Sequence, residues 1–258
     1  MRRIVAITTP LTLLLLIAPL LAVIPAGLTG GETLALPPEG LSLRWWKVLA
    51  EDPRWGEALL NSLLVGMGAT VVSLALGVPA AIGLWLARFP GRGVVLALCA
   101  LPLAVPSVTA ALALYFGLAA IGLANSLAGL ALAHAVLGVP FVVIAVLASL
   151  RMVDPVLLRA AAASGATRPA AYARIVIPLA SPGIAAGGLF AFAASFDELM
   201  VAIFVTAPGA FTLPRQMYAG IREQLSPAIF AAATFVTVLA ITLMWTAETL
   251  ARRRVRGA

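Results

Sequence analysis

The sequence predicts an all-α membrane protein with six transmembrane helices and a cytoplasmic helix–glycine–helix loop between the fourth and fifth of them. Three observations predict this fold class. Hydrophobic residues make up 62% of the 258 residues and charged residues only 10%, whereas a soluble domain carries about 25% charged residues. The hydrophobic residues gather in long segments that match the roughly 20 residues a helix needs to cross a bilayer. The basic residues gather in alternate connections, which is typical of cytoplasmic loops.

Six apolar segments are long enough to be transmembrane helices. The expected spans are 4–26, 57–87, 94–120, 127–150, 178–206 and 228–250. The first follows Arg2 and Arg3, as the apolar part of a signal peptide would, but it is long for one and no clear A-x-A cleavage motif follows it. We therefore expect a retained helix. Three prolines inside the spans are expected to kink them: Pro102, Pro106 and Pro140.

The connection after the first span, 27–54, is polar and rich in tryptophan. Trp45 and Trp46 lie in the stretch LSLRWWKVLAEDPRW, which ends at Trp55. Tryptophan is enriched where a membrane meets water. We therefore expect an interfacial element in this connection.

The basic residues predict the orientation of the six spans. Twelve of the 17 lie in segments on the same side as both termini: Arg2, Arg3, Arg88, Arg92, Arg151, Arg159, Arg168, Arg174, Arg252, Arg253, Arg254 and Arg256. The opposite loops hold the other five: Arg44, Lys47, Arg54, Arg215 and Arg222. An excess of lysine and arginine marks the cytoplasmic side. Both termini are therefore expected in the cytoplasm.

Composition also excludes several function classes. The net charge of +7 would suggest nucleic acid in a soluble protein, but the cytoplasmic bias accounts for it here and no nucleic-acid partner is expected. Cys99 and His134 are the only cysteine and histidine, so we expect no metal and no cofactor, and we expect His134 to be packed or hydrogen-bonded. The chain lacks G-x-x-x-x-G-K-[ST], and its only lysine is Lys47. ATP hydrolysis by a P-loop is therefore excluded, so any such energy must come from another subunit.

The longest cytoplasmic connection, 151–177, carries strong helical signals. Asp154 can cap a helix that begins at Pro155, and alanines follow through Ala163. Gly165 can end this helix, and a second short helix, 169–177, would lead into the fifth span. The result is an exposed elbow with small side chains, which we interpret as a docking element rather than an ordinary loop.

This segment resembles a known motif. It supplies Asp154, Arg159-Ala160-Ala161, Gly165-Ala166, Ile177-Pro178 and Pro182-Gly183-Ile184, and it is similar in spacing to the EAA coupling loop of type I ABC importer permeases. Arg159 stands where that family has glutamate, and Ser164 where it often has leucine. The resemblance implies that Asp154, Arg159, Ala160, Ala161, Gly165 and Ala166 form the loop that contacts the ATPase.

A second stretch resembles the spermidine/putrescine C-type permeases within that family. It contains Ser195-Phe196-Asp197-Glu198, Phe204-Val205-Thr206-Ala207-Pro208, Leu213-Pro214 and Leu225-Ser226-Pro227. The resemblance implies one transmembrane permease domain over 1–258 that moves a small cationic solute such as a polyamine into the cytoplasm by alternating access. Ferric iron, an opine or an amino-acid-like compound is the alternative cargo. An ion-coupled secondary transporter is a further alternative, although no inverted repeat is visible.

The resemblance also implies the partners of the chain. They are a second homologous permease, two ATP-binding subunits, a periplasmic or extracellular solute-binding protein and the lipid bilayer. The expected location is the bacterial inner membrane, which the chain crosses several times.

Asp197 and Glu198 are the candidate site residues, together with Ser195 and Asn61. A charged residue costs about 2.5–3.5 kcal/mol at the centre of a lone span, and if the fifth span enters the membrane near Pro182, Asp197 lies roughly 22 Å above that end. Both carboxylates should therefore face protein or a wet cavity. They either attract a cation in the pathway or form a structural ion pair or helix cap. Neighbouring helical residues point about 100° apart, so both face one spot only if the helix is broken.

Overall fold

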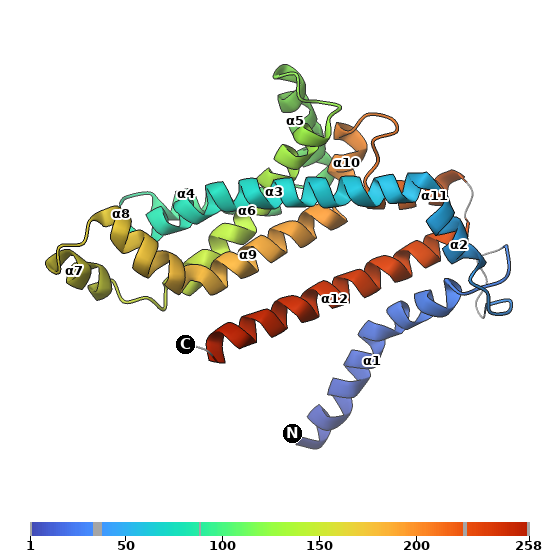
Figure 1. The fold of residues 1–258 in the computed structure, drawn as a ribbon, viewed down its shortest axis with the longest axis horizontal. Helices are drawn as coiled ribbons and strands as arrows, with labels where there is room; N and C mark the ends of the chain where they lie inside the picture. Colours follow the sequence, from blue (N-terminus) through green and yellow to red (C-terminus); the bar gives the residue numbers. More distant parts are fainter. Residues whose placement is uncertain (1, 33–37, 88, 224–225, 257–258) are drawn as a thin grey trace. The chain divides into compact units, whose positions relative to one another are not determined.

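The computed structural model describes residues 2–32, 38–87, 89–223 and 226–256. Arg88 and Leu225, which the sequence analysis uses, lie outside these ranges, as do the side chains of Arg2, Arg3 and the arginines in 252–256. The described residues form the following elements: α1 (Arg2–Ala26), α2 (Arg44–Glu51), α3 (Pro53–Leu86), α4 (Arg92–Ala100), η1 (Leu101–Leu103), α5 (Ser107–Ala120), α6 (Leu127–Leu150), α7 (Val156–Ala163), α8 (Arg168–Ala171), η2 (Tyr172–Val176), α9 (Ile177–Asp197), α10 (Met200–Val205), α11 (Leu213–Glu223) and α12 (Ala228–Arg256) (Figure 1). The prediction of an all-α fold is confirmed.

The chain divides into two compact units. One combines residues 1–56 with 216–258, and the other comprises residues 57–215. Helices α3 and α11 each begin in one unit and end in the other. The expectation of a single domain over 1–258 stays a prediction.

In the first unit, α1 and α12 pack at a close contact beside Gly27. A Cβ atom on Gly27 would lie 3.0 Å from the carbonyl oxygen of Phe230, so a side chain there would require the backbone of α12 to shift. In the described part of the polar connection that follows, Thr29 Oγ1 accepts hydrogen bonds from the amides of Gly31 and Glu39, each at 3.2 Å. The indole of Trp45 donates to the Gly31 carbonyl at 3.0 Å. These hydrogen bonds therefore fix the described loop residues against the short helix α2.

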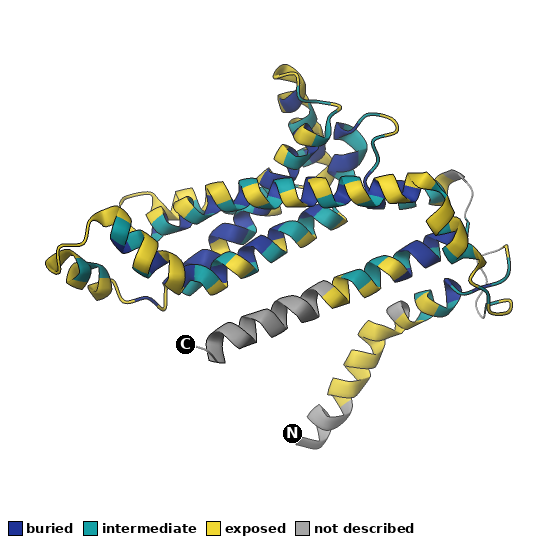
Figure 2. Ribbon diagram, in the orientation of Figure 1, coloured by how far each residue is buried: buried dark blue, intermediate teal, exposed yellow. Residues whose placement is uncertain are grey.

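The described side chains of α1 are apolar and exposed along most of the helix (Figure 2). Leucines at 13–16 each leave about half or more of their surface uncovered. A helix that is apolar all round suits lipid or another helix rather than water. The same holds for apolar side chains exposed on α3, such as Leu60 and Val71.

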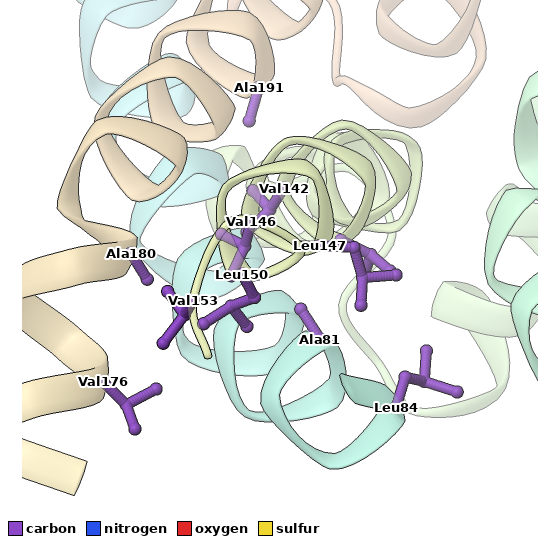
Figure 3. Packing of buried hydrophobic residues seen from close by; sticks show 11 residues of the cluster. Ala81, Leu84, Val142, Val146, Leu147, Leu150, Val153, Val176, Ala180 and Ala191 are labelled. Carbon is purple, nitrogen blue, oxygen red and sulfur yellow. The ribbon is translucent and has the colours of Figure 1, made fainter. Parts of the chain in front are cut away.

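The second unit is built around α6, which lies beside α9 along much of its length (Figure 1). One buried cluster joins residues of α3, α6 and α9, and Figure 3 shows its members facing one another. Its fully covered side chains include Ala81 of α3, Val142 and Val146 of α6, and Ala180 of α9. In lipid such packing is driven by van der Waals contact rather than by exclusion of water, so fit decides its strength.

Two glycines set the distance between α6 and α9. A Cβ atom on Gly187 would lie 2.8 Å from the Cα of Val142, and one on Gly183 would lie 2.6 Å from the carbonyl oxygen of Ala145. Real Cβ atoms essentially never approach so closely. The G-x-x-x-G spacing of Gly183 and Gly187 is therefore used for close helix packing.

The helices agree only in part with the six expected spans. Among the described residues, four stretches are long and apolar enough to cross a membrane, or five if the bent pair Arg92–Leu103 and Ser107–Ala120 counts as one span: Thr8–Ala26, Pro53–Leu86, Leu127–Leu150 and Arg168–Asp197. In α12 the described apolar part, Ala228–Thr242, is shorter. Six transmembrane helices therefore stay a prediction.

The expected third span, 94–120, is not one straight helix. Arg92–Leu103 and Ser107–Ala120 are bent by 100° relative to each other at a short break. Pro106 stands directly before α5, with an extended ψ of 133°. Proline has no amide hydrogen and disfavours helical backbone in the residue before it. The predicted kink at Pro102 and Pro106 is thus a full change of direction.

Candidate functional site at the break between α9 and α10

Asp197 and Glu198 lie where a helix is interrupted. Helix α9 ends at Asp197, Glu198 is extended with a ψ of 111°, and α10 begins at Met200. The expected fifth span, 178–206, is therefore interrupted at this point, which is the break that would let both acids face one spot. The reason is local, because Glu198 Oε1 accepts a hydrogen bond from the amide of Val201 at 3.1 Å. A new helix start leaves such amides without intrahelical partners, and the glutamate satisfies one of them.

The two neighbouring carboxylates have different surroundings. Glu198 is half-buried and caps α10. Asp197 is exposed in this chain, and within the described ranges it has no side-chain hydrogen bond or ion pair. Because the helix does not continue past Asp197, the 100° separation of consecutive helical residues does not apply to the pair. Asp197 is the acid left available for a ligand or for a partner subunit.

Ser195 joins the end of α9 to the middle of α6. Its Oγ lies 2.8 Å from Nδ1 of His134, and both side chains are buried. Other hydroxyls in these helices, such as those of Thr70 and Thr206, donate to the carbonyl four residues earlier in their own helix. Ser195 instead reaches across to α6. His134 is thus hydrogen-bonded, as expected, and it fixes the chain two residues before Asp197.

Asn61 lies on α3 and holds the segment that follows α10. Its Nδ2 donates to the carbonyl oxygen of Phe211 at 3.0 Å, and the neighbouring Ser62 Oγ accepts from the amide of Leu213 at 2.8 Å. The structure shows no hydrogen bond between Asn61 and Ser195, Asp197 or Glu198 among the residues it describes. Of the four candidate site residues, three lie together at the break and Asn61 lies at the next loop.

Arg215 binds the C-terminal end of α10. From the sequence it is expected only to lie in an outer loop. Its Nη1 donates to the carbonyl oxygen of Thr206 at 3.0 Å and also lies 3.3 Å from the carbonyl oxygen of Ala207 and 3.4 Å from that of Ala202. It bonds to Thr206 Oγ1 as well. The guanidinium stacks 4.2 Å from the ring centroid of Phe211. Burial lowers the pKa of Arg215.

The body of α10 is embedded in a second apolar cluster. Val201, Ala202 and Val205 are fully buried there, against residues of α3, α5 and α6. The amide of Asn125 donates to the carbonyl oxygen of Val205 at 2.9 Å. Six residues are too few for a stable helix on its own, so these contacts and the two end caps hold α10 in place.

The connection between α6 and α9 contains two short helices, α7 and α8, with Gly165 between them. Asp154 Oδ1 accepts from the amide of Val156 at 2.8 Å, at the start of α7. Gly165 has a φ of +83°, and Ala166 donates to the carbonyl of Ala161 at 3.0 Å, which together form a Schellman ending. Arg159 and Ala160 are exposed, and Ala161 is half-buried. A docking role for this surface stays a prediction.

The elbow is anchored by its apolar residues. Leu158 of α7 and Tyr172 of η2 pack against the cluster of α3, α6 and α9. The turn η2 is π-helical and leads directly into α9. A force on α7 would therefore act on the helix that ends at Asp197.

The described part of the chain holds no group of three or more histidine, cysteine, aspartate or glutamate residues that could bind a metal ion. The chemistry available at the break is that of an exposed carboxylate, a buried histidine–serine pair and helix ends capped by opposite charges. Of these groups, the exposed Asp197 carboxylate is the one that can attract a cation, and the others hold the helices around it.

Comparisons with known proteins agree on one family. The sequence model described as "Binding-protein-dependent transport system inner membrane component" matches residues 73–257. The spermidine/putrescine transport system permease protein PotC of Escherichia coli (strain K12) is 27% identical over 219 residues, which cover 85% of this chain and 83% of PotC. The putrescine transport system permease protein PotI of the same strain is 30% identical over 204 residues, which cover 76% of this chain and 73% of PotI.

The fold is also that of a solved transporter chain. In the crystal structure of a bacterial alginate ABC transporter in complex with an alginate pentasaccharide-bound periplasmic protein, one chain matches with a TM-score of 0.76 and 18% identity. The match covers 97% of this chain and 94% of that chain. At this identity the similarity concerns the fold.

Proposed function

This chain belongs to the family of binding-protein-dependent transport system inner membrane components, and from that premise we propose that it is the permease subunit of an ATP-driven ABC importer for a small cationic solute such as a polyamine. The observation that carries the proposal is the placement of Asp197 and Glu198 at the break between α9 and α10. A chain with 10% charged residues places two acids there at a cost, which the attraction of a cation would offset.

The choice of a polyamine rests on charge and on the relatives. Polyamines are multivalent cations, and a free carboxylate in a poorly screened site attracts them more strongly than it would in water. PotC and PotI are named for spermidine and putrescine transport. Asp197 would contact an ammonium group of the solute, and Glu198 would hold α10 so that Asp197 stays at the end of α9.

The transport cycle would be alternating access. A second homologous permease would complete the pathway, two ATP-binding subunits would dock at the elbow formed by α7 and α8, and a solute-binding protein would deliver the cation from the outer side. Both termini would lie in the cytoplasm. Closure of the ATP-binding subunits would push α7, and Leu158 and Tyr172 would pass the motion to α6 and α9.

The test is Asp197→Asn in the assembled transporter, because this change removes the charge and keeps the size. We expect uptake of radiolabelled spermidine to fall at least about tenfold, since a lost charge contact is worth about 1.5–3 kcal/mol. ATP hydrolysis stimulated by the loaded binding protein should fall with it. Asp154→Asn is the contrasting variant: it lies in the proposed coupling elbow, so any loss of uptake there should come with an unchanged KM for spermidine, whereas Asp197→Asn should raise that KM.

Normal assembly with unchanged uptake and unchanged stimulated ATP hydrolysis in Asp197→Asn would rule out a direct role for this residue. A parent transporter that takes up a neutral solute but shows no saturable uptake of spermidine would exclude a cationic cargo.

A further inference from the structure

We propose that Arg215 is a positioning residue for the solute site, which holds α10 by its C-terminal end and thereby sets the place of Asp197. This inference rests on the proposed role of Asp197 in the pathway. Arg215 is separated from Asp197 by the whole of α10, so it would act through that helix and not by contact with the solute.

The first support is the hydrogen bonding of the guanidinium. Nη1 of Arg215 donates to the carbonyl oxygen of Thr206 at 3.0 Å and lies 3.3–3.4 Å from those of Ala207 and Ala202. The Ala202 and Ala207 carbonyls also accept backbone amides, so the Thr206 carbonyl, directly after α10, is the acceptor that the helix end leaves for Arg215. Among the described residues, Arg215 has no carboxylate partner within ion-pair distance. Its charge is therefore directed at the end of α10.

The second support is the matching charge at the other end of the same helix. Glu198 caps the first turn of α10 through Val201, and Arg215 caps the last turn. Negative charge at a helix start and positive charge at its end both interact favourably with the helix dipole. A helix of six residues held at both ends and buried in its middle moves as one body, so a shift at Thr206 reaches Glu198.

The third support is the anchoring of Arg215 itself. The residue follows directly after Leu213-Pro214, whose first amide is held by Ser62 of α3 at 2.8 Å. Its guanidinium stacks on Phe211, whose carbonyl is held by Asn61 of α3 at 3.0 Å. These contacts tie Arg215 to the long helix α3. Asn61 and Ser62 therefore help to hold Arg215 in place against the end of α10.

The experiment measures the position of residue 197 directly. In the full transporter with Cys99→Ser, Asp197→Cys is labelled with a membrane-impermeant thiosulfonate, with and without Arg215→Gln. We expect Arg215→Gln to change the labelling rate at position 197 at least about fivefold, the lower end of coupling between distant sites. In the background that keeps Asp197, the same substitution should raise the KM for spermidine about fivefold and leave kcat within about twofold.

Two further variants make the result specific. Arg215→Lys keeps the positive charge, but its ammonium ends one bond short of Nη1 and lacks the planar group that stacks on Phe211. Labelling and KM should therefore lie between those of wild type and Arg215→Gln, and this variant decides the test if Arg215→Gln fails to assemble. Arg222→Gln removes an exposed arginine of the same helix that stacks on Tyr218, and it should change neither quantity.

An unchanged labelling rate in Arg215→Gln overturns the proposal, as does a fall in kcat and assembly with an unchanged KM. Failure of the proposed function gives a different pattern, because Asp197→Asn would then transport normally while the labelling rate could still respond to Arg215.

Discussion

Two adjacent acids, Asp197 and Glu198, differ in their contacts with the backbone. Glu198 accepts from the amide of Val201 and so is engaged in starting α10. Asp197 is the last residue of α9 and is exposed. The sequence shows that both are costly in a membrane, but it cannot divide their roles. That division depends on a break whose position is visible only in the structure.

The role of Glu198 as a cap gives a prediction that separates the effect of its hydrogen bond from the effect of its charge. Glu198→Ala removes the acceptor for the Val201 amide and should lower the stability of the permease by about 0.5–2 kcal/mol. Glu198→Gln keeps a carbonyl oxygen in the same place and should cost less, about 0.3–1 kcal/mol from the lost charge at the helix start. Thermal unfolding of the purified complex measures both. Equal losses in the two variants would show that the hydrogen bond does not matter.

At the scale of elements, the sequence predicts the helices better than their interruptions. The apolar segments 57–87 and 127–150 correspond closely to α3 and α6. The segments 94–120 and 178–206 are equally apolar but are broken in the structure. Apolar composition records only that a segment prefers lipid or protein to water and does not show where its helix breaks. The break before α10 depends on Glu198 at the helix start and also on contacts from Arg215 and the amide of Asn125.

The close packing of α6 against α9 predicts that an alanine at Gly187 of α9 destabilises the protein, whereas an alanine at Gly83 of α3 does not. Gly187→Ala would place a Cβ atom 2.8 Å from the Val142 Cα, and such overpacking costs about 1–3 kcal/mol. A Cβ atom on Gly83 would have no other atom within 4 Å, so Gly83→Ala should be neutral or stabilising by up to about 1 kcal/mol. Unfolding of the two purified variants in a detergent titration compares them. A destabilised Gly83→Ala with an unaffected Gly187→Ala would contradict this packing.

A substitution in the elbow between α6 and α9 should weaken the coupling to ATP hydrolysis and leave solute binding unchanged. Gly165 has a φ of +83°, and a side chain there costs about 1–2 kcal/mol. Gly165→Val should therefore reduce the ATP hydrolysis that a loaded binding protein stimulates, with the KM for spermidine unchanged. Gly209, with a φ of +88°, carries the same backbone penalty in the loop after α10. If Gly209→Val reduced the stimulated hydrolysis as strongly and left KM unchanged, the elbow would have no special role.

At the scale of the whole molecule, much of the apolar surface has no cover within this chain. The described side chains of α1 and outward faces of α3 and α5 are exposed and apolar (Figure 2). Lipid and a second permease are the partners expected for such surfaces in this family. Composition alone predicts this setting, because 62% hydrophobic residues exceed what one chain of this size can bury. The partner's identity and the exact solute are not properties of this sequence, since the proposed importer takes the other half of its pathway from a second permease.

The most direct test of the importer function is reconstitution of the complex that co-purifies with this chain in mild detergent. The complex is placed in vesicles with a solute-binding protein, and uptake of radiolabelled spermidine is followed with and without ATP. We predict that an ATP-binding subunit and a second permease co-purify, and that saturable uptake requires both ATP and the binding protein and is competed by putrescine. Uptake by the chain alone, driven by a proton gradient and indifferent to ATP, would contradict this function.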